Sequence, residues 1–415
     1  MERIGKIVLK IIKGLGIFLG ILAGLMVLYL VALSLANSPA YTWRVIRYGQ
    51  SDTQDYKIFP ERPIENGSIP SFIPRGHQGT PYEVEYSYKG ETHKETLEDL
   101  LKRTDTKAFL IVKDDQLIYE TYLNSSEKDI DTSFSSAKSF NSALIGAAIA
   151  DGYIASVDDP VIKYIPEIAG RGLDTLTVRD LLMMNSGIRY VEGGELPLYQ
   201  APFADDVVTY YSSDMRKAAL GVQASGAPIG EAFHYNNWHP LLEGLIIERA
   251  TGMHVAEYLQ ERFWKPMGAE FPASWSLDSN ASGFEKMESG INARARDFAR
   301  FGLIFLHNGY WNGVQILPED WVRESTAPLR PDPRTWETMS DWPDYNGYYK
   351  YHWWGINNPD GSYDFYAHGR YDQMIYVAPR KNVVIVRLGQ TPHDIPLAAW
   401  PLALHNIVDQ LGEPE

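Results

Sequence analysis

The segment from Ser135 to about Ala150 constrains the fold most, because its composition is that of a helix buried on nearly all sides. Its apolar residues follow the first turn at the density of a buried helix: Phe140, Ala143, Leu144, Ile145, Ala147, Ala148 and Ile149. A helix that is apolar all round lies inside a large core. The sequence therefore predicts a buried helix that begins close to Ser135.

The first turn of this helix carries a Ser-x-x-Lys pattern. Ser135 and Lys138 are three positions apart, so their side chains share one helix face. A serine hydroxyl needs an adjacent base to act as a nucleophile, and a lysine in a dry pocket can be that base. We therefore expect Ser135 to be a nucleophile and Lys138 its base; the alternative is a serine that only caps the helix. A second copy at 125–128 lies in a polar run without an apolar helix, and we interpret it as chance.

Two later strings supply further candidate groups. Tyr235 and Asn237 precede an apolar helix expected over 240–251; a tyrosine can relay a proton, and an asparagine can position a lysine or a carbonyl. The alternative for Tyr235 is an aromatic wall beside a helix cap.

The third string, His368-Gly369-Arg370, leads into a strong strand. A glycine there lets substrate approach the backbone. The N–H groups of Arg370 and Ser135 could then hold an oxyanion. His368 and Arg370 would add positive charge for substrate, although His368 alone is also explained as a structural histidine.

Composition excludes several classes of function. The chain has 415 residues and a net charge of −15, which argues against nucleic acid as a partner. It has no cysteine, so disulfides and thiolate metal sites are excluded. No Gly-x-Ser-x-Gly elbow, His-Glu-x-x-His zinc motif or glycine-rich phosphate loop is present. We expect neither a metal nor another cofactor.

The N-terminus predicts a membrane anchor. Gly14 to Ala36 is a run of 23 uncharged residues, long enough to cross a bilayer as a helix. Basic residues precede it, so the N-terminus should stay in the cytoplasm and the rest of the chain outside, periplasmic or extracellular. A cleaved signal peptide is the alternative. We expect an anchor over 1–36, a proline-rich extended tether over 37–92 that either stays extended or wraps the body, and a catalytic domain over 93–415.

The order of the predicted elements indicates an α+β fold. Strands are expected at 108–112 and 117–122 near the start of the domain, and at 374–378 and 383–389 near its end. Helices occupy most of the chain between them. An antiparallel sheet built from both ends, flanked by helices, explains this order.

Three motifs follow one another along the chain in a fixed order. They are Ser-x-x-Lys, then Tyr-x-Asn about 100 residues later, then a His-Gly strand near the C-terminus. With LTVRDLLMMNSG (176–187) and NARARDFARFGLIFLHNGYWNG (292–313), this set resembles the penicillin-recognising serine hydrolases: class C β-lactamases, D-alanyl-D-alanine carboxypeptidases, and the related esterases and aminohexanoate-oligomer hydrolases. The strings are most similar to the last branch. The resemblance implies a mixed α/β body with an antiparallel sheet, a helical lobe and a cleft between them.

By this resemblance, Ser135 is acylated, Lys138 activates it, Tyr235 relays protons and Asn237 positions substrate. The Ser135 and Arg370 N–H groups hold the oxyanion. One departure concerns the third element, where many members have Lys-Thr-Gly and this chain has Ala367-His368-Gly369, which weakens the case for recognition of a penicillin carboxylate. Asp372 also stands where this branch usually has glycine.

Two classes of function follow. The first is a membrane-anchored serine hydrolase acting on a small ester or amide, with a linear amide, a peptidoglycan fragment or a β-lactam among the candidates. The second is a non-catalytic protein of the same fold that binds cell-wall ligand or a partner. Because all three catalytic side chains are present, we favour the hydrolase.

Overall fold

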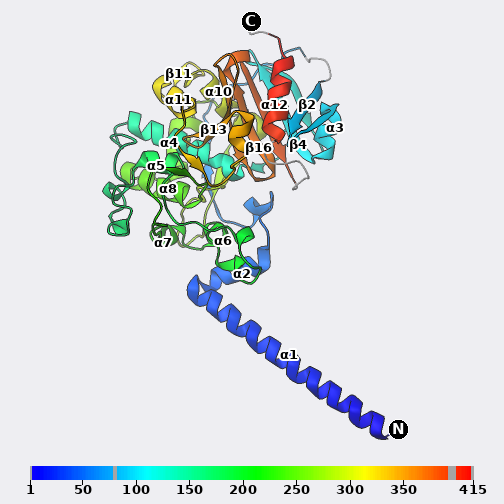
Figure 1. Ribbon diagram of the computed structural model, residues 1–415. Helices are drawn as coiled ribbons and strands as arrows, with labels where there is room; N and C mark the ends of the chain where they lie inside the picture. Colours follow the sequence, from blue (N-terminus) through cyan, green and yellow to red (C-terminus); the bar gives the residue numbers. More distant parts are fainter. Residues whose placement is uncertain (1, 78–81, 391–398, 413–415) are drawn as a thin grey trace. The chain divides into compact units, whose positions relative to one another are not determined.

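The computed structural model describes residues 2–77, 82–390 and 399–412, which form two compact units (Figure 1). The first unit contains the chain up to Ser51 together with Val191–Ser213. The second contains Asp52–Tyr190 and the chain from Asp214 onward. A segment from the middle of the sequence is therefore associated with the N-terminal helices.

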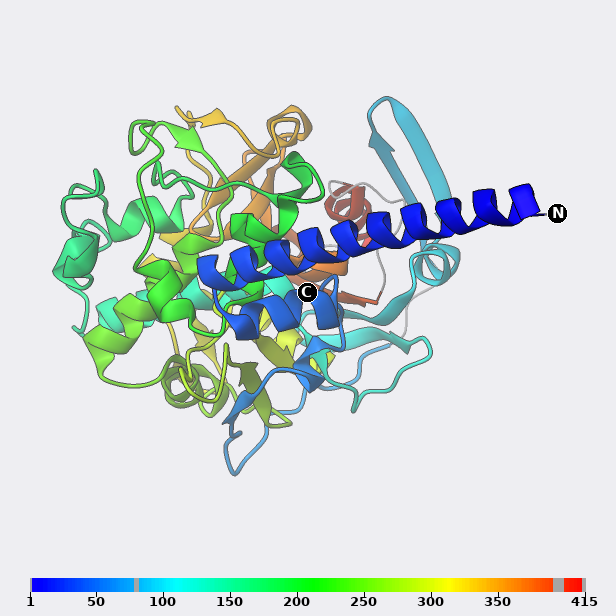
Figure 2. The same ribbon diagram turned by 90° about the horizontal axis from the view of Figure 1, so that it is seen from below.

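The first unit is built on the N-terminal helix α1 (Glu2–Ala36), which Figure 2 shows as one unbroken rod. Among the described residues it is the one helix long and apolar enough to cross a membrane. Helix α2 (Pro39–Tyr48) follows, and its cap residue Ser38 accepts a hydrogen bond from the backbone N–H of Tyr41. The segment from 191 to 213 adds two short turns and a helix: η5 (Gly193–Glu195), η6 (Ala201–Phe203) and α6 (Asp205–Tyr211).

The second unit contains a seven-stranded antiparallel sheet assembled from both ends of the domain. Its strands alternate in side-chain direction, so one apolar set faces each side. In spatial order the strands are β13 (Gly347–Lys350), β14 (Trp353–Asn357), β15 (Tyr363–Gly369), β16 (Gln373–Ala378), β17 (Val383–Gly389), β4 (Thr106–Lys113) and β5 (Gln116–Tyr122).

Helices cover both faces of this sheet. On one face, α12 (Ala399–Gln410) and α3 (Leu97–Arg103) share a core with alternate strand residues such as Phe109 and Ile385. On the other face lies α10 (Ala295–Leu306), where a β-carbon at Gly302 would come within 2.7 Å of Val384. Glycine at that position lets α10 approach the sheet closely. The sheet is thus the middle layer of a three-layer body.

The remaining helices form a group around the buried helix α4 (Ala137–Ala150), which packs against α8 (Trp238–Thr251). Helix α5 (Val178–Leu182) starts with a capping box in which Thr177 and Asp180 exchange hydrogen bonds. The other members are α7 (Met215–Ala219), α9 (Val255–Leu259), which continues into a π-helical turn over Gln260–Trp264, and α11 (Glu319–Thr326).

Smaller sheets tie strands within residues 52–77 and 82–96 to the body. Strand β1 (Glu61–Ile64) pairs with β8 (Ala273–Ser276), in a four-stranded sheet completed by β9 (Ile291–Ala293) and β6 (Asp131–Thr132). The hairpin of β2 (Glu83–Tyr88) and β3 (Glu91–Thr96) contacts α12. This part of the predicted tether therefore wraps the body. The anchor, tether and domain boundaries as such stay a prediction.

The predicted fold class is confirmed. The strands expected at 108–112, 117–122, 374–378 and 383–389 are β4, β5, β16 and β17, and they lie in one antiparallel sheet. The helix expected from Ser135 begins at Ala137, after a 3₁₀ turn over Phe134–Ser136.

Candidate active site

Ser135 lies in the 3₁₀ turn η2 (Phe134–Ser136) that leads into α4. The turn begins with Phe134 at φ 45°, a left-handed conformation that costs a non-glycine residue energy. Ser133 just before it is fixed by a hydrogen bond from its N–H to the carbonyl of Ile291. Ser135 itself is half-buried, whereas Phe134 and Ser136 of the same turn are buried.

Lys138 is one turn further along and holds the serine hydroxyl. Its Nζ donates to Ser135 Oγ at 2.8 Å and to the backbone carbonyl of Glu288 at 3.2 Å. The lysine is only 1% exposed, and within the described ranges no carboxylate forms an ion pair with it. Its two acceptors are thus a hydroxyl and a carbonyl, which aim the amine at Ser135.

Tyr235 lies beside this pair, in the loop before α8. Lys138 Nζ is 4.8 Å from the centroid of the Tyr235 ring. The ring also packs against Tyr349 and Trp354, and the Tyr235 N–H donates to Thr338 Oγ1 at 2.8 Å. No hydrogen bond of the Tyr235 hydroxyl occurs among residues 2–77, 82–390 and 399–412. The structure therefore brings Ser135, Lys138 and Tyr235 together and leaves the phenol oxygen available.

Gly369, at the end of β15, closes the site from the other side. A β-carbon at this position would lie 2.2 Å from Ser133 O and 3.0 Å from Ser135 N. A side chain there would collide with the turn that carries the serine, so glycine is required. Arg370 follows immediately, with its side chain exposed. The backbone after Gly369 and the backbone of Ser135 are thus neighbours, as two oxyanion donors must be.

Asn237 and His368 have partners other than the serine and the lysine. Asn237 Nδ2 donates to the Tyr190 hydroxyl at 2.8 Å, and its buried Oδ1 has no hydrogen-bond partner in the described part of the chain. His368 Nε2 is 3.1 Å from Asp372 Oδ1, and both side chains are nearly buried. These two residues frame the site, and neither forms a hydrogen bond with Ser135 or Lys138.

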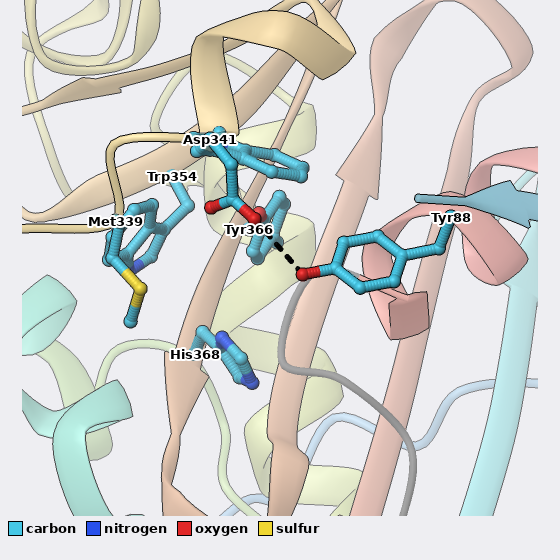
Figure 3. A pocket seen from close by; sticks show the side chains of 7 residues that line it. Tyr88, Met339, Asp341, Trp354, Tyr366 and His368 are labelled. Atoms are coloured by element: carbon cyan, nitrogen blue, oxygen red, sulfur yellow. Dashed lines mark hydrogen bonds between the residues drawn. The ribbon is translucent and has the colours of Figure 1, made fainter. Parts of the chain in front are cut away.

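A hollow adjoins the site on the face of the sheet that α12 covers. Trp354 and Tyr366 are directly paired on β14 and β15, and His368 lies two residues along on the same side. Figure 3 shows Tyr88 reaching from the β2–β3 hairpin toward Asp341, to which its hydroxyl donates at 3.0 Å. The hollow encloses about 390 Å³ including its open mouth, and Met339 and Trp342 complete its wall.

The sequence had not indicated several of these wall residues. Tyr88, Met339 and Asp341 are distant in the sequence from the three motifs, and only the fold brings them together with Tyr366, which directly precedes Ala367-His368-Gly369. Trp354 and Tyr190 fall in the segments around 348–354 and over 188–232, which we expect from the sequence to supply cleft-wall residues. The turn-forming residues around 339–346, such as Pro343 and Asn346, could have indicated a loop, but no periodicity placed it beside β15.

The comparisons with known proteins agree with this geometry. A family model described as Beta-lactamase matches residues 94–405, which is most of the chain. The protein belongs to the beta-lactamase family. A curated relative in this family, the 6-aminohexanoate-dimer hydrolase of Paenarthrobacter ureafaciens, is 28% identical over 304 residues, which are 71% of this chain and 75% of that protein.

Several solved structures are also similar to this chain. The "Putative 6-aminohexanoate-dimer hydrolase from Bacillus anthracis" is 26% identical, with a TM-score of 0.72 over 86% of this chain and 92% of that one. An octameric penicillin-binding protein homologue from Pyrococcus abyssi shares the fold, with a TM-score of 0.59 and 17% identity over 77% of this chain and 76% of that one. The chain is thus a β-lactamase-related serine hydrolase with a mixed α/β fold of the penicillin-binding-protein type.

Proposed function

We propose that this protein is a membrane-anchored serine hydrolase that cleaves an ester or amide through an acyl-enzyme on Ser135. The observation that carries the proposal is the 2.8 Å hydrogen bond from Lys138 Nζ to Ser135 Oγ in a pocket where the lysine is 1% exposed. Such a pair supplies a nucleophile and a base without histidine.

The reaction has two halves. Lys138 Nζ takes the hydroxyl proton as Ser135 Oγ forms a bond to the substrate carbonyl carbon, and the N–H groups of Ser135 and Arg370 hold the resulting oxyanion. The bond to the leaving amine or alcohol then breaks as that group receives a proton through the Tyr235 hydroxyl. In the second half, water attacks the acyl-enzyme, its proton passes to Tyr235 and Lys138, and the freed serine oxygen is protonated again.

The walls of the site favour a substrate with an uncharged apolar group. The hollow that His368 lines presents the rings of Trp342, Trp354 and Tyr366, which bind such groups by burial and stacking. Where many relatives carry a lysine for a substrate carboxylate, this chain has His368 bonded to Asp372. We therefore infer a linear amide or an ester in preference to a β-lactam. The curated relative, named a 6-aminohexanoate-dimer hydrolase, supports this choice.

We further infer that α1 anchors the protein in a membrane with the catalytic unit outside. Its stretch of 23 uncharged residues matches the thickness of a bilayer core, and Arg3, Lys6, Lys10 and Lys13 at its start favour a cytoplasmic N-terminus. A signal peptide has the same composition, so the mass of the mature protein from its native membrane distinguishes the two.

A fluorophosphonate probe tests the proposal against the alternative of a non-catalytic ligand-binding protein. The probe should label the wild type and not Ser135→Ala. Two results would overturn the assignment. One is equal labelling of both proteins; the other is a wild type that is not labelled and hydrolyses none of a panel of short esters and linear amides.

A further inference from the structure

The first unit exposes large apolar side chains from two distant segments. Leu198 is 90% exposed, Tyr199 65% and Trp43 61%. With the exposed side chains of Ile46 and Phe203 they make up a set that we term the apolar collar. Isolated apolar residues are common on protein surfaces, but a gathered set of this kind indicates an interaction site.

The two segments of the collar are tied to each other and to α1. The Tyr41 hydroxyl of α2 donates to the carbonyl of Pro202 at 2.6 Å. On α1, the Tyr29 hydroxyl donates to the carbonyl of Tyr199 at 2.9 Å, and the Tyr29 ring meets Phe203 edge-to-face at 6.0 Å. The collar is therefore attached to the C-terminal end of α1.

The position of this attachment along α1 corresponds to a membrane boundary. A helix rises 1.5 Å per residue, so the uncharged stretch of α1 is about 34 Å long, against about 30 Å for the hydrocarbon core of a bilayer. Tyr29 is seven residues before Ala36, which places it about 10 Å from the end of the helix. When α1 spans the bilayer with this stretch centred in it, Tyr29 lies about 8 Å inside the edge of the hydrocarbon core, within the roughly 5–10 Å to which the apolar side chains of interfacial segments are buried.

The chemistry of the collar suits that layer. Tryptophan and tyrosine concentrate at membrane interfaces, where an apolar ring and a polar atom are both satisfied. On α2, Trp43 and Ile46 are three apart and share one exposed side, while Arg44 turns away and donates to the carbonyl of Ser212 at 2.9 Å. Helix α2 is thus amphipathic, as a helix lying in the interface must be.

We propose that the apolar collar binds the interfacial layer of the bilayer that α1 spans, so that two chain segments hold the protein on the membrane. This inference rests on the anchor in the proposed function. It also gives segment 191–213 a role. That segment leaves the second unit directly after Tyr190, whose hydroxyl accepts the hydrogen bond from Asn237, so the collar is continuous in sequence with a residue of the site wall.

The absence of cysteine makes a direct test available, because one introduced cysteine gives one label. Leu198→Cys in the full chain carries an environment-sensitive fluorophore on a side chain that is already exposed. Leu19→Cys reports the middle of α1. Asp320→Cys, whose native side chain is 95% exposed on α11, is the matched control. Each protein is reconstituted into phosphatidylcholine–phosphatidylglycerol vesicles that contain lipids with a doxyl quencher at shallow or deep positions.

The expected result is several-fold stronger quenching of the Leu198 label than of the Asp320 label, with the shallow quencher more effective than the deep one. Quenching at Leu19 but not at Leu198 would overturn the collar and leave the anchor intact. A Leu198 label that is blue-shifted yet unquenched would show that protein covers the collar, which also overturns the proposal. Absence of quenching at both positions would overturn anchor and collar together.

Discussion

Gly369 lies so close to the Ser135 backbone that a β-carbon at 369 would be 3.0 Å from Ser135 N and 2.2 Å from Ser133 O. Real β-carbons do not approach a carbonyl oxygen so closely, so Gly369→Ala must displace β15 or the serine turn. Loss of one oxyanion donor typically costs about 10²–10³-fold in kcat, and we expect a loss of that order. Gly194→Ala is the control, because nothing lies within 4 Å of its added carbon. Equal activity of the two variants would contradict the assigned oxyanion site.

Lys138→Ala should lower kcat/KM by about 10²–10⁴-fold, the range for removal of a general base. The chain provides a matched control in the second Ser-x-x-Lys copy. Lys128 is exposed, and Ser125 and Ser126 there donate to Asp129, so Lys128→Ala should leave kcat/KM unchanged. Steady-state hydrolysis of an activated ester measures both; similar losses would mean that Lys138 is not the base.

Tyr235→Phe keeps the ring that packs on Trp354 and Tyr349 and removes only the hydroxyl. We expect kcat to fall by about 10²-fold or more while the thermal midpoint stays near that of the wild type, because the phenol oxygen forms no hydrogen bond in the described part of the chain. Tyr310→Phe is the control, because Tyr310 and Asn312 repeat the Tyr-x-Asn spacing at the exposed short strand β10 (Tyr310–Trp311). If kcat is unchanged in Tyr235→Phe, the Tyr235 hydroxyl is not the proton relay.

The hollow should control the size of the group that the enzyme accepts. Met339 lies on its wall and is 36% exposed, so Met339→Trp can narrow the space without disturbing the core. We expect KM to rise several-fold for an ester with a bulky aromatic acyl group and to stay constant for the acetyl ester. Parallel changes with both esters would indicate that substrate does not enter the hollow.

His239 predicts a dependence of stability on pH. Burial, and after it the neighbouring His352, lowers the pKa of His239 well below 6.5, and its Nε2 lies 2.5 Å from Ser186 Oγ. Below pH 6.5 the unfolded chain binds a proton there that the folded chain cannot bind, so the free energy of unfolding falls as the pH drops. His239→Gln should lose less stability between pH 7.5 and pH 5 than the wild type in urea titrations. The exposed His77→Gln should follow the wild type, and identical pH slopes in all three would contradict this account.

The sheet and its helices could be predicted from the sequence because their signals are local. β16 and β17 are two apolar runs separated by a turn. Helix α5 begins with a capping box whose residues, Thr177 and Asp180, can be recognised in the sequence. The pairing of Ser135 with Lys138 could also be predicted, because side chains three positions apart lie on the same face of a helix. The resemblance to the family placed Tyr235 and Gly369 on the same site.

Other features depend on tertiary contacts that no local pattern encodes. The wall formed by Tyr88 and Asp341 joins residues 253 positions apart. The sequence of residues 188–232 indicates a lobe insertion or cleft wall, but no local pattern shows that segment 191–213 associates with α1 through Tyr29 and with α2 through Tyr41. Asn237 could have turned toward Lys138, but a tyrosine 47 positions earlier in the chain binds its amide. Such pairings are decided by packing of the whole molecule.

Trapping of the acyl-enzyme tests the central claim most directly. The full chain is mixed with an excess of an activated ester, quenched in acid within the first turnovers, digested and mapped by mass spectrometry. The account predicts that the mass of the acyl group appears on the peptide at Ser135, and that Ser135→Ala gives no adduct and loses on the order of 10⁴-fold or more of kcat. An adduct on another residue, or turnover by Ser135→Ala near the wild-type rate, would contradict it.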